Sequence, residues 1–199
     1  MARPVTEILV LCTANTCRSP MAEALLARRL AGRCAVGSVR SAGIQAAGIQ
    51  GAGLLGEGER PPAEAISAMA AYGLDTGSHR SRQLTVADLV RANLVIGMAR
   101  AHVRQAVVTL PEVWPRAFTL KEIVRRGEAI GARQAGEPLS GWLHRAHDAR
   151  DRRSLLGDYL DDDVVDPIGG PPQAYADTAA LLDRLVTRLV TLCWAYGTH

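Results

Sequence analysis

Short apolar runs alternate with helix-like stretches along most of the chain. Residues 8–11 are apolar throughout, which is typical of a strand buried on both faces. The runs 36–41, 94–98 and 117–120 predict three further strands. Apolar residues at helical spacing predict helices over 20–31, 63–72, 101–110 and 171–196. This alternation predicts an α/β fold, a three-layer domain with a central four-stranded parallel sheet and helices on both faces.

Two segments depart from the alternation. Residues 44–60 are rich in glycine and alanine and contain no aromatic residue, so we expect a loop there. Residues 127–163 are charged and predict one or two surface helices near the loop around Asp166. Their apolar side chains available for burial are Trp142, Leu143, Leu155 and Leu156. We interpret both segments as insertions in a single domain that spans residues 1–199.

Composition is that of an ordinary globular protein, with 48% hydrophobic and 22% charged residues. The net charge of +3 comes from arginines spread along the chain, so no nucleic-acid partner is predicted. No apolar stretch approaches the ~20 residues of a membrane span. We therefore expect a cytoplasmic protein without a membrane partner, either a monomer or a weak homodimer. Its cysteines should be reduced, with Cys34 and Cys193 acting as small buried apolar residues.

The most informative stretch is residues 12–19, which lies between the first predicted strand and the first predicted helix. Such a turn can aim backbone N–H groups inward, and with the positive end of the helix dipole these bind a phosphate-sized anion. The same donors favour the thiolate form of Cys12, a candidate nucleophile. Arg18 can hold two phosphate oxygens at once, and Ser19 can donate a hydrogen bond to the sulfur. The predicted substrate-binding loop comprises Thr13, Ala14, Asn15, Thr16, Cys17, Arg18 and Ser19.

This loop, followed by Pro20, Ala22 and Glu23, resembles that of the low-molecular-weight protein-tyrosine phosphatases, which reads C-x-G-N-x-C-R-S-P. It also resembles the bacterial protein-arginine phosphatases, whose loop reads C-T-G-N-T-C-R-S-P. The resemblance implies hydrolysis of phosphotyrosine and/or phosphoarginine in proteins through a phosphocysteine intermediate, with no cofactor and no metal. One departure is Ala14, which stands where the family has glycine.

The resemblance extends to residues outside the loop. Asp166, presented with Pro167 before two glycines, matches the family's general acid, and His79 matches a histidine that supports Asn15. Cys17 lies across the same small loop from Cys12, so we expect it to trap an oxidised Cys12 as a disulfide. The aspartates at 161, 162 and 163 are expected to be exposed. His144 and His147 lack the partners of a metal site and are expected on a solvated face.

Substrate choice remains open between the two phosphorylated side chains. Thr16 stands where tyrosine-directed members typically have an aliphatic residue, and Ile168 stands where the family often has an aromatic one. Both differences favour phosphoarginine slightly. Two alternative functions are a thiol-dependent arsenate reductase of the same fold and a phosphate-binding regulatory module without catalysis.

Overall fold

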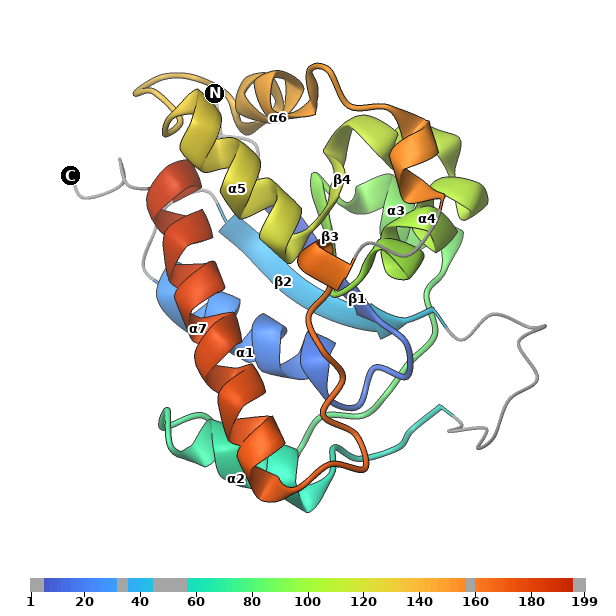
Figure 1. The fold of residues 1–199 in the computed structure, drawn as a ribbon, viewed down its shortest axis with the longest axis vertical. Coiled ribbons are helices and arrows are strands. Elements are labelled where there is room, and N and C mark those ends of the chain that lie inside the picture. Colours follow the sequence, from blue (N-terminus) through green and yellow to red (C-terminus); the bar gives the residue numbers. More distant parts are fainter. Residues whose placement is uncertain (1–5, 32–35, 45–56, 157–159, 195–199) are drawn as a thin grey trace.

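Four parallel strands in the order β2-β1-β3-β4 form the centre of the fold (Figure 1). This computed structural model describes residues 6–31, 36–44, 57–156 and 160–194. The strands are β1 (Thr6–Cys12), β2 (Val36–Gly43), β3 (Leu94–Gly97) and β4 (Ala117–Thr119). Each predicted run forms a strand, and every pairing is parallel. The predicted sheet is therefore confirmed.

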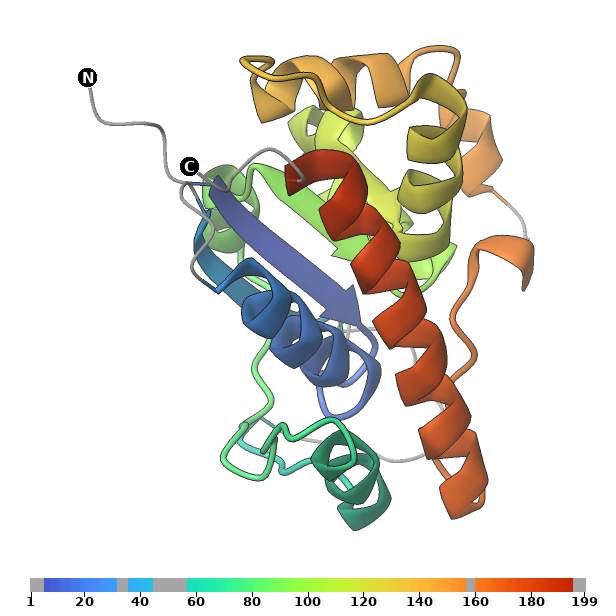
Figure 2. The same ribbon diagram turned by 90° about the vertical axis from the view of Figure 1, so that its left-hand side faces the viewer.

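Helices cover both faces of this sheet (Figures 1 and 2). The face toward Ile8 and Val10 packs against α1 (Arg18–Leu30), α5 (Leu120–Ile130) and α7 (Pro172–Trp194), and α2 (Ala63–Ala70) joins the same apolar core by packing against α7. The face toward Leu9 and Leu11 packs against α3 (Val86–Arg91), α4 (Arg100–Thr109) and the 3-10 helix η1 (Pro111–Arg116). Successive β1 side chains thus enter opposite cores, which explains why the run is apolar throughout. Among the described residues, no helix is both long and apolar enough to cross a membrane.

The strand order places β1 between β2, which follows it through α1, and β3, which comes later in the chain. The loop after β1 therefore leaves the sheet where the chain switches from one side of β1 to the other. In open α/β sheets this point at the carboxyl ends of the strands is where ligands bind. Residues 12–18 thus lie at the position where a ligand is expected in this fold.

The segment 127–163 contains α6 (Leu139–His147) and two 3-10 helices, η2 (Arg152–Leu155) and η3 (Leu160–Asp162). Trp142, Leu143 and Leu155 are buried, as expected. The expectation for Leu156 is wrong, because its side chain is 71% exposed. Leu156 follows η2 in an extended conformation, which turns its side chain away from the core that Leu155 enters.

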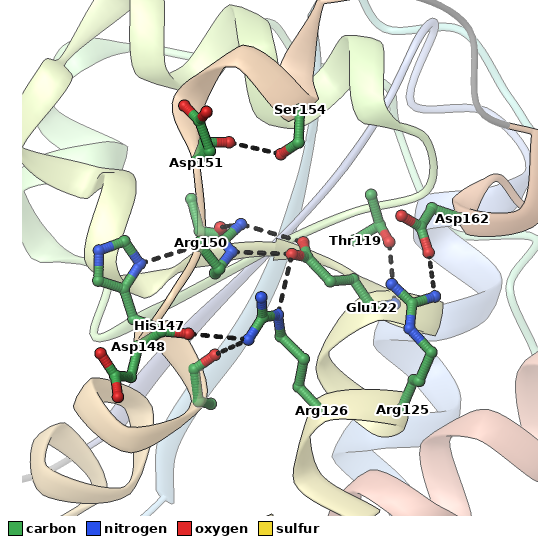
Figure 3. A network of polar contacts seen from close by, with 12 residues as sticks. Thr119, Glu122, Arg125, Arg126, His147, Asp148, Arg150, Asp151, Ser154 and Asp162 are labelled. Atoms are coloured by element: carbon green, nitrogen blue, oxygen red, sulfur yellow. Dashed lines mark hydrogen bonds and ion pairs between the residues drawn. The ribbon is translucent and has the colours of Figure 1, made fainter. Parts of the chain in front are cut away.

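Arg150 anchors this segment to β4, through the Ala117 carbonyl oxygen, and to Glu122 of α5, a pairing that Figure 3 shows. Its side chain is 1% exposed, and its guanidinium lies 3.8 Å from the ring centre of Trp114 and 4.0 Å from that of Phe118. Arg150 Nε and Nη2 donate to the two carboxylate oxygens of Glu122, at 2.8 and 3.0 Å. This fork-to-fork pairing satisfies a charge that burial would otherwise make costly.

The two histidines of α6 have different surroundings. His144 is exposed, as expected. His147 packs edge-on against Trp114, with ring centres 5.4 Å apart, and its Nδ1 lies 3.2 Å from Arg150 Nη1. The prediction of a solvated face is therefore wrong for His147, because the neighbouring turn folds back over η1. Cys193 is buried in α7, as predicted, whereas Cys34 and most of the 44–60 loop lie outside the described residues.

Candidate active site

The loop from Cys12 to Arg18 joins β1 directly to α1, and we call it the phosphate loop. The helix begins at Arg18, two residues before the predicted start at Pro20. Asn15 adopts a left-handed conformation, with φ of 56°, which asparagine tolerates better than most residues. Gly43 at the end of β2 passes beneath the loop, where an added Cβ would lie 2.9 Å from the Thr13 carbonyl oxygen. The tight turn therefore depends on asparagine within the loop and glycine under it.

Cys12 is 3% exposed, and its sulfur lies 2.9 Å from the Ser19 hydroxyl oxygen. Asn15 Nδ2 donates to that same hydroxyl oxygen at 3.0 Å. Because the amide nitrogen can only donate, the Ser19 proton remains available for the sulfur. A hydroxyl donating to sulfur stabilises the thiolate form of Cys12.

Asn15 is held by bonds that fix the direction of its amide. The backbone N–H of Arg82 donates to Asn15 Oδ1 at 3.0 Å, so the oxygen and nitrogen of the amide cannot be exchanged. Asn15 Nδ2 also donates to the Ser41 hydroxyl at 2.8 Å, and that hydroxyl donates to Glu23 at 2.5 Å. The structure places His79 Nε2 2.8 Å from the Asn15 carbonyl oxygen. The bond from Asn15 to Ser19 therefore comes from an amide that other hydrogen bonds hold in one orientation.

Arg18 and Asp166 meet at the mouth of the phosphate loop. Arg18 is 6% exposed, and its Nη2 lies 2.5 Å from Asp166 Oδ2, while the Asp166 side chain is 40% exposed. Arg18 Nη1 also donates to the Val164 carbonyl oxygen at 3.1 Å. The predicted catalytic carboxylate, 148 residues away in sequence, thus lies beside the predicted phosphate-binding guanidinium.

The segment before Asp166 is anchored more firmly than the sequence suggested. Asp162 is 2% exposed, so its predicted exposure is wrong. It accepts hydrogen bonds from Arg100 and from Arg125, and Figure 3 shows the contact with Arg125. Asp163 accepts from the backbone N–H of Arg100 at 2.8 Å. Only Asp161 is exposed as expected. The error has a physical cause, because two arginines from distant helices converge on Asp162 and compensate for its burial.

The remaining loop side chains differ in exposure. Thr13 is exposed and Ala14 is partly buried, whereas Thr16 and Cys17 are buried. The Thr16 hydroxyl has no hydrogen-bond partner among the described residues. Burial, followed by the nearby Asp166 and Cys12, raises the pKa of Cys17 to about 12, so this thiol stays protonated.

The sequence does not predict one residue that lies at the site. His102, in the first turn of α4, is 2% exposed, and its Nε2 lies 3.1 Å from the Thr13 hydroxyl oxygen. Nothing in the sequence distinguishes it from an ordinary histidine on an amphipathic helix. Only the packing of α4 beside the phosphate loop brings it there.

Comparison with known proteins agrees with this geometry. The family model described as low molecular weight phosphotyrosine protein phosphatase matches residues 7–141, which include the whole phosphate loop. The chain belongs to this family. Its members are phosphoric monoester hydrolases that act on phosphorylated proteins through a cysteine. Asp166 lies beyond the matched residues, so its assignment rests on its position beside Arg18.

Two relatives cover most of the chain. The protein-arginine-phosphatase of Geobacillus stearothermophilus is 32% identical over 189 residues, which are 93% of this chain and 97% of the relative. The low molecular weight protein-tyrosine-phosphatase Etp of Escherichia coli K12 is 32% identical over 146 residues, 70% of this chain and 88% of Etp.

Solved structures give the same picture. The YwlE arginine phosphatase from Geobacillus stearothermophilus superimposes with a TM-score of 0.65 at 28% identity, covering 98% of this chain and 99% of that one. A low molecular weight protein tyrosine phosphatase from T. tengcongensis gives a TM-score of 0.66 at 30% identity, covering 93% and 97%. The family is thus shown by sequence and by fold, and both kinds of named substrate occur among its relatives.

Proposed function

We propose that this protein phosphatase works through Cys12 as nucleophile, Arg18 as the phosphate-binding cation and Asp166 as the acid and base. The observation that carries the proposal is the meeting of these three residues around one loop, with the Ser19 hydroxyl 2.9 Å from the sulfur. In the first step the Cys12 thiolate attacks phosphorus, and the bond from phosphorus to the leaving group breaks. Asp166 gives its proton to that leaving group, and a phosphocysteine remains.

The second step reverses the role of Asp166. As a carboxylate it removes a proton from water, the water oxygen attacks phosphorus, and the Cys12 thiolate leaves with inorganic phosphate as the other product. Ser19 stabilises the departing thiolate, while Arg18 and the N-terminus of α1 stabilise the charge on the phosphoryl oxygens. Arg18 Nη2 donates to both Thr13 and Asp166, so a phosphate oxygen that binds this nitrogen would compete with one of them, and we expect the more exposed Asp166 to give way.

We propose that the protein slightly prefers phosphoarginine to phosphotyrosine as its substrate. Thr16 supports this preference. Its buried hydroxyl has no partner among the described residues and is therefore available to a polar group bound in the loop. A guanidinium leaving group is polar, whereas the ring of phosphotyrosine packs better against an aliphatic side chain. The relative that matches 93% of this chain is named a protein-arginine-phosphatase, which supports the same preference.

The test is a side-by-side assay of wild type and Thr16→Ile on phosphotyrosine and phosphoarginine peptides. We expect Thr16→Ile to raise the ratio of phosphotyrosine to phosphoarginine turnover at least several-fold. Thr16→Val is the control for the hydroxyl alone, because it keeps the branched shape, and Thr16→Ser should retain the wild-type ratio. An unchanged ratio in Thr16→Ile would remove Thr16 from the argument.

A further inference from the structure

His102 contacts the phosphate loop although none of the proposed catalytic steps uses it. It lies in the first turn of α4, 2% exposed, with Nε2 3.1 Å from Thr13 Oγ1. Its other ring nitrogen, Nδ1, has no hydrogen-bond partner among the described residues. A buried imidazole with one nitrogen committed to the loop and one unpaired needs an explanation.

The Thr13 hydroxyl has a second neighbour. Arg18 Nη2 lies 3.3 Å from Thr13 Oγ1, and because a guanidinium has no acceptor, Thr13 accepts this bond. The hydroxyl oxygen then has one lone pair left and one proton to donate. If His102 donates a hydrogen bond to Thr13, it uses the remaining lone pair, and if it accepts one, it uses the proton.

The ring is neutral, because burial and the nearby Arg18 lower the pKa of His102 to about 3. Two tautomers remain. With the proton on Nδ1, a buried N–H would have no partner, whereas with the proton on Nε2 only a lone pair is left unpaired. Buried donors without partners are the rarer of the two defects, so the Nε2–H tautomer is favoured. In that tautomer His102 donates to Thr13.

We propose that His102 is a positioning residue: with Arg18 it occupies both lone pairs of Thr13 Oγ1, so that the Thr13 proton is donated to a phosphoryl oxygen in the loop. The inference rests on the proposed function of the loop and adds a specific donor to it. Thr13 is exposed, and its hydroxyl contacts Arg18, the residue proposed to bind the phosphoryl group, so we expect a phosphoryl oxygen held by Arg18 to lie near this hydroxyl. His102 itself does not touch the substrate.

Inorganic phosphate, used as a competitive inhibitor of aryl phosphate hydrolysis, measures this donor directly. Loss of a hydrogen bond to a charged group predicts about tenfold weaker phosphate inhibition in Thr13→Val. His102→Gln and His102→Asn form a matched pair, because the glutamine amide reaches the place of Nε2 and the asparagine amide does not. We expect His102→Asn to weaken phosphate inhibition about three- to tenfold and His102→Gln to restore most of it.

The double variant separates positioning from packing. If His102 acts through Thr13, adding His102→Asn to Thr13→Val changes phosphate inhibition no further, whereas losses that multiply would overturn the proposal. Nitrogen-15 NMR of the wild-type imidazole needs no variant, and a proton on Nδ1 would overturn it equally. Absence of any phosphatase activity would instead refute the proposed function. The NMR measurement of the His102 tautomer does not depend on activity, so the two failures can be distinguished.

Discussion

Replacing Asp162 by asparagine tests how the segment that carries Asp166 is held. The Asp162 carboxylate is 3% exposed and accepts from Arg100 Nη2 at 2.7 Å, Arg100 Nε at 3.1 Å and Arg125 Nη1 at 2.5 Å. Asparagine has nearly the same shape but keeps one acceptor oxygen and loses the charge. The change therefore removes the ion pairs without creating a cavity.

The expected loss follows from the exposure of the two arginines. Removing one partner of a buried ion pair costs about 3–5 kcal/mol. The Arg125 side chain is 58% exposed and can turn toward water, whereas Arg100 is 14% exposed and stays beside the substituted residue. We therefore expect Asp162→Asn to lower the free energy of unfolding by about 2–3 kcal/mol at pH 7. For a chain of this size that lowers Tm by about 4–12 °C.

The pH dependence has a definite sign. Burial alone would raise the pKa of Asp162, but hydrogen bonds from Arg125 and Arg100 outweigh it and hold the pKa below its usual value. A carboxyl with a depressed folded pKa stabilises the protein above its unfolded pKa of about 3.9. That contribution is lost as the pH falls through the folded pKa. The stability difference between wild type and Asp162→Asn should thus be constant near neutrality and narrow below about pH 4.

Urea unfolding followed by tryptophan fluorescence, at a series of pH values from 7 downward, measures this difference. Asp161→Asn is the matched control, because it removes the same charge from an exposed neighbour. The reasoning is refuted if Asp162→Asn is as stable as the control at pH 7. It is equally refuted if the difference keeps its full size in acid.

Two further predictions concern catalysis and oxidation. Asp166→Ala should slow hydrolysis of substrates with poor leaving groups by about 10²–10⁴-fold and slow an activated aryl phosphate less in the bond-breaking step. Equal losses in that step, measured in single turnovers, would mean that Asp166 maintains structure instead. Mild peroxide should inactivate the enzyme reversibly, with a Cys12–Cys17 disulfide visible by mass spectrometry, because both thiols lie in one small loop. In Cys17→Ser the inactivation should become irreversible, and unchanged recovery in that variant would exclude Cys17 as the trap.

Local patterns predicted the sheet well. Each face of β1 enters a different apolar core, so all four residues of the run 8–11 are apolar. This run alone was therefore enough to predict a strand buried on both faces. The short α3 was missed, although Thr85 and Asp88 form a capping box whose spacing is visible in the sequence. The first helix begins at Arg18 and not at Pro20, because the phosphate loop continues directly into the helix.

What the sequence could not reveal depends on contacts between distant segments. Asp162 was predicted to be exposed, like its two aspartate neighbours. It can be buried because Arg100 and Arg125 both donate hydrogen bonds to its carboxylate. His102 reads as an ordinary helical histidine until α4 packs beside Thr13. Leu156 was predicted to be buried but is exposed, because η2 ends at Leu155 and the extended backbone at Leu156 turns its side chain outward.

Detection of phosphate on Cys12 tests the central claim most directly. In Asp166→Ala, an activated aryl phosphate can still transfer its phosphoryl group, but the water that should hydrolyse the intermediate lacks its base. We predict that rapid mixing followed by acid quench and mass spectrometry finds the Asp166→Ala protein phosphorylated at Cys12, with aryl alcohol released in a burst close to the enzyme concentration. The same experiment on Asp166→Ala combined with Cys12→Ser should show no burst. Turnover by the wild type without any phosphate on Cys12 in the Asp166→Ala variant, or phosphate on another residue, would contradict the account.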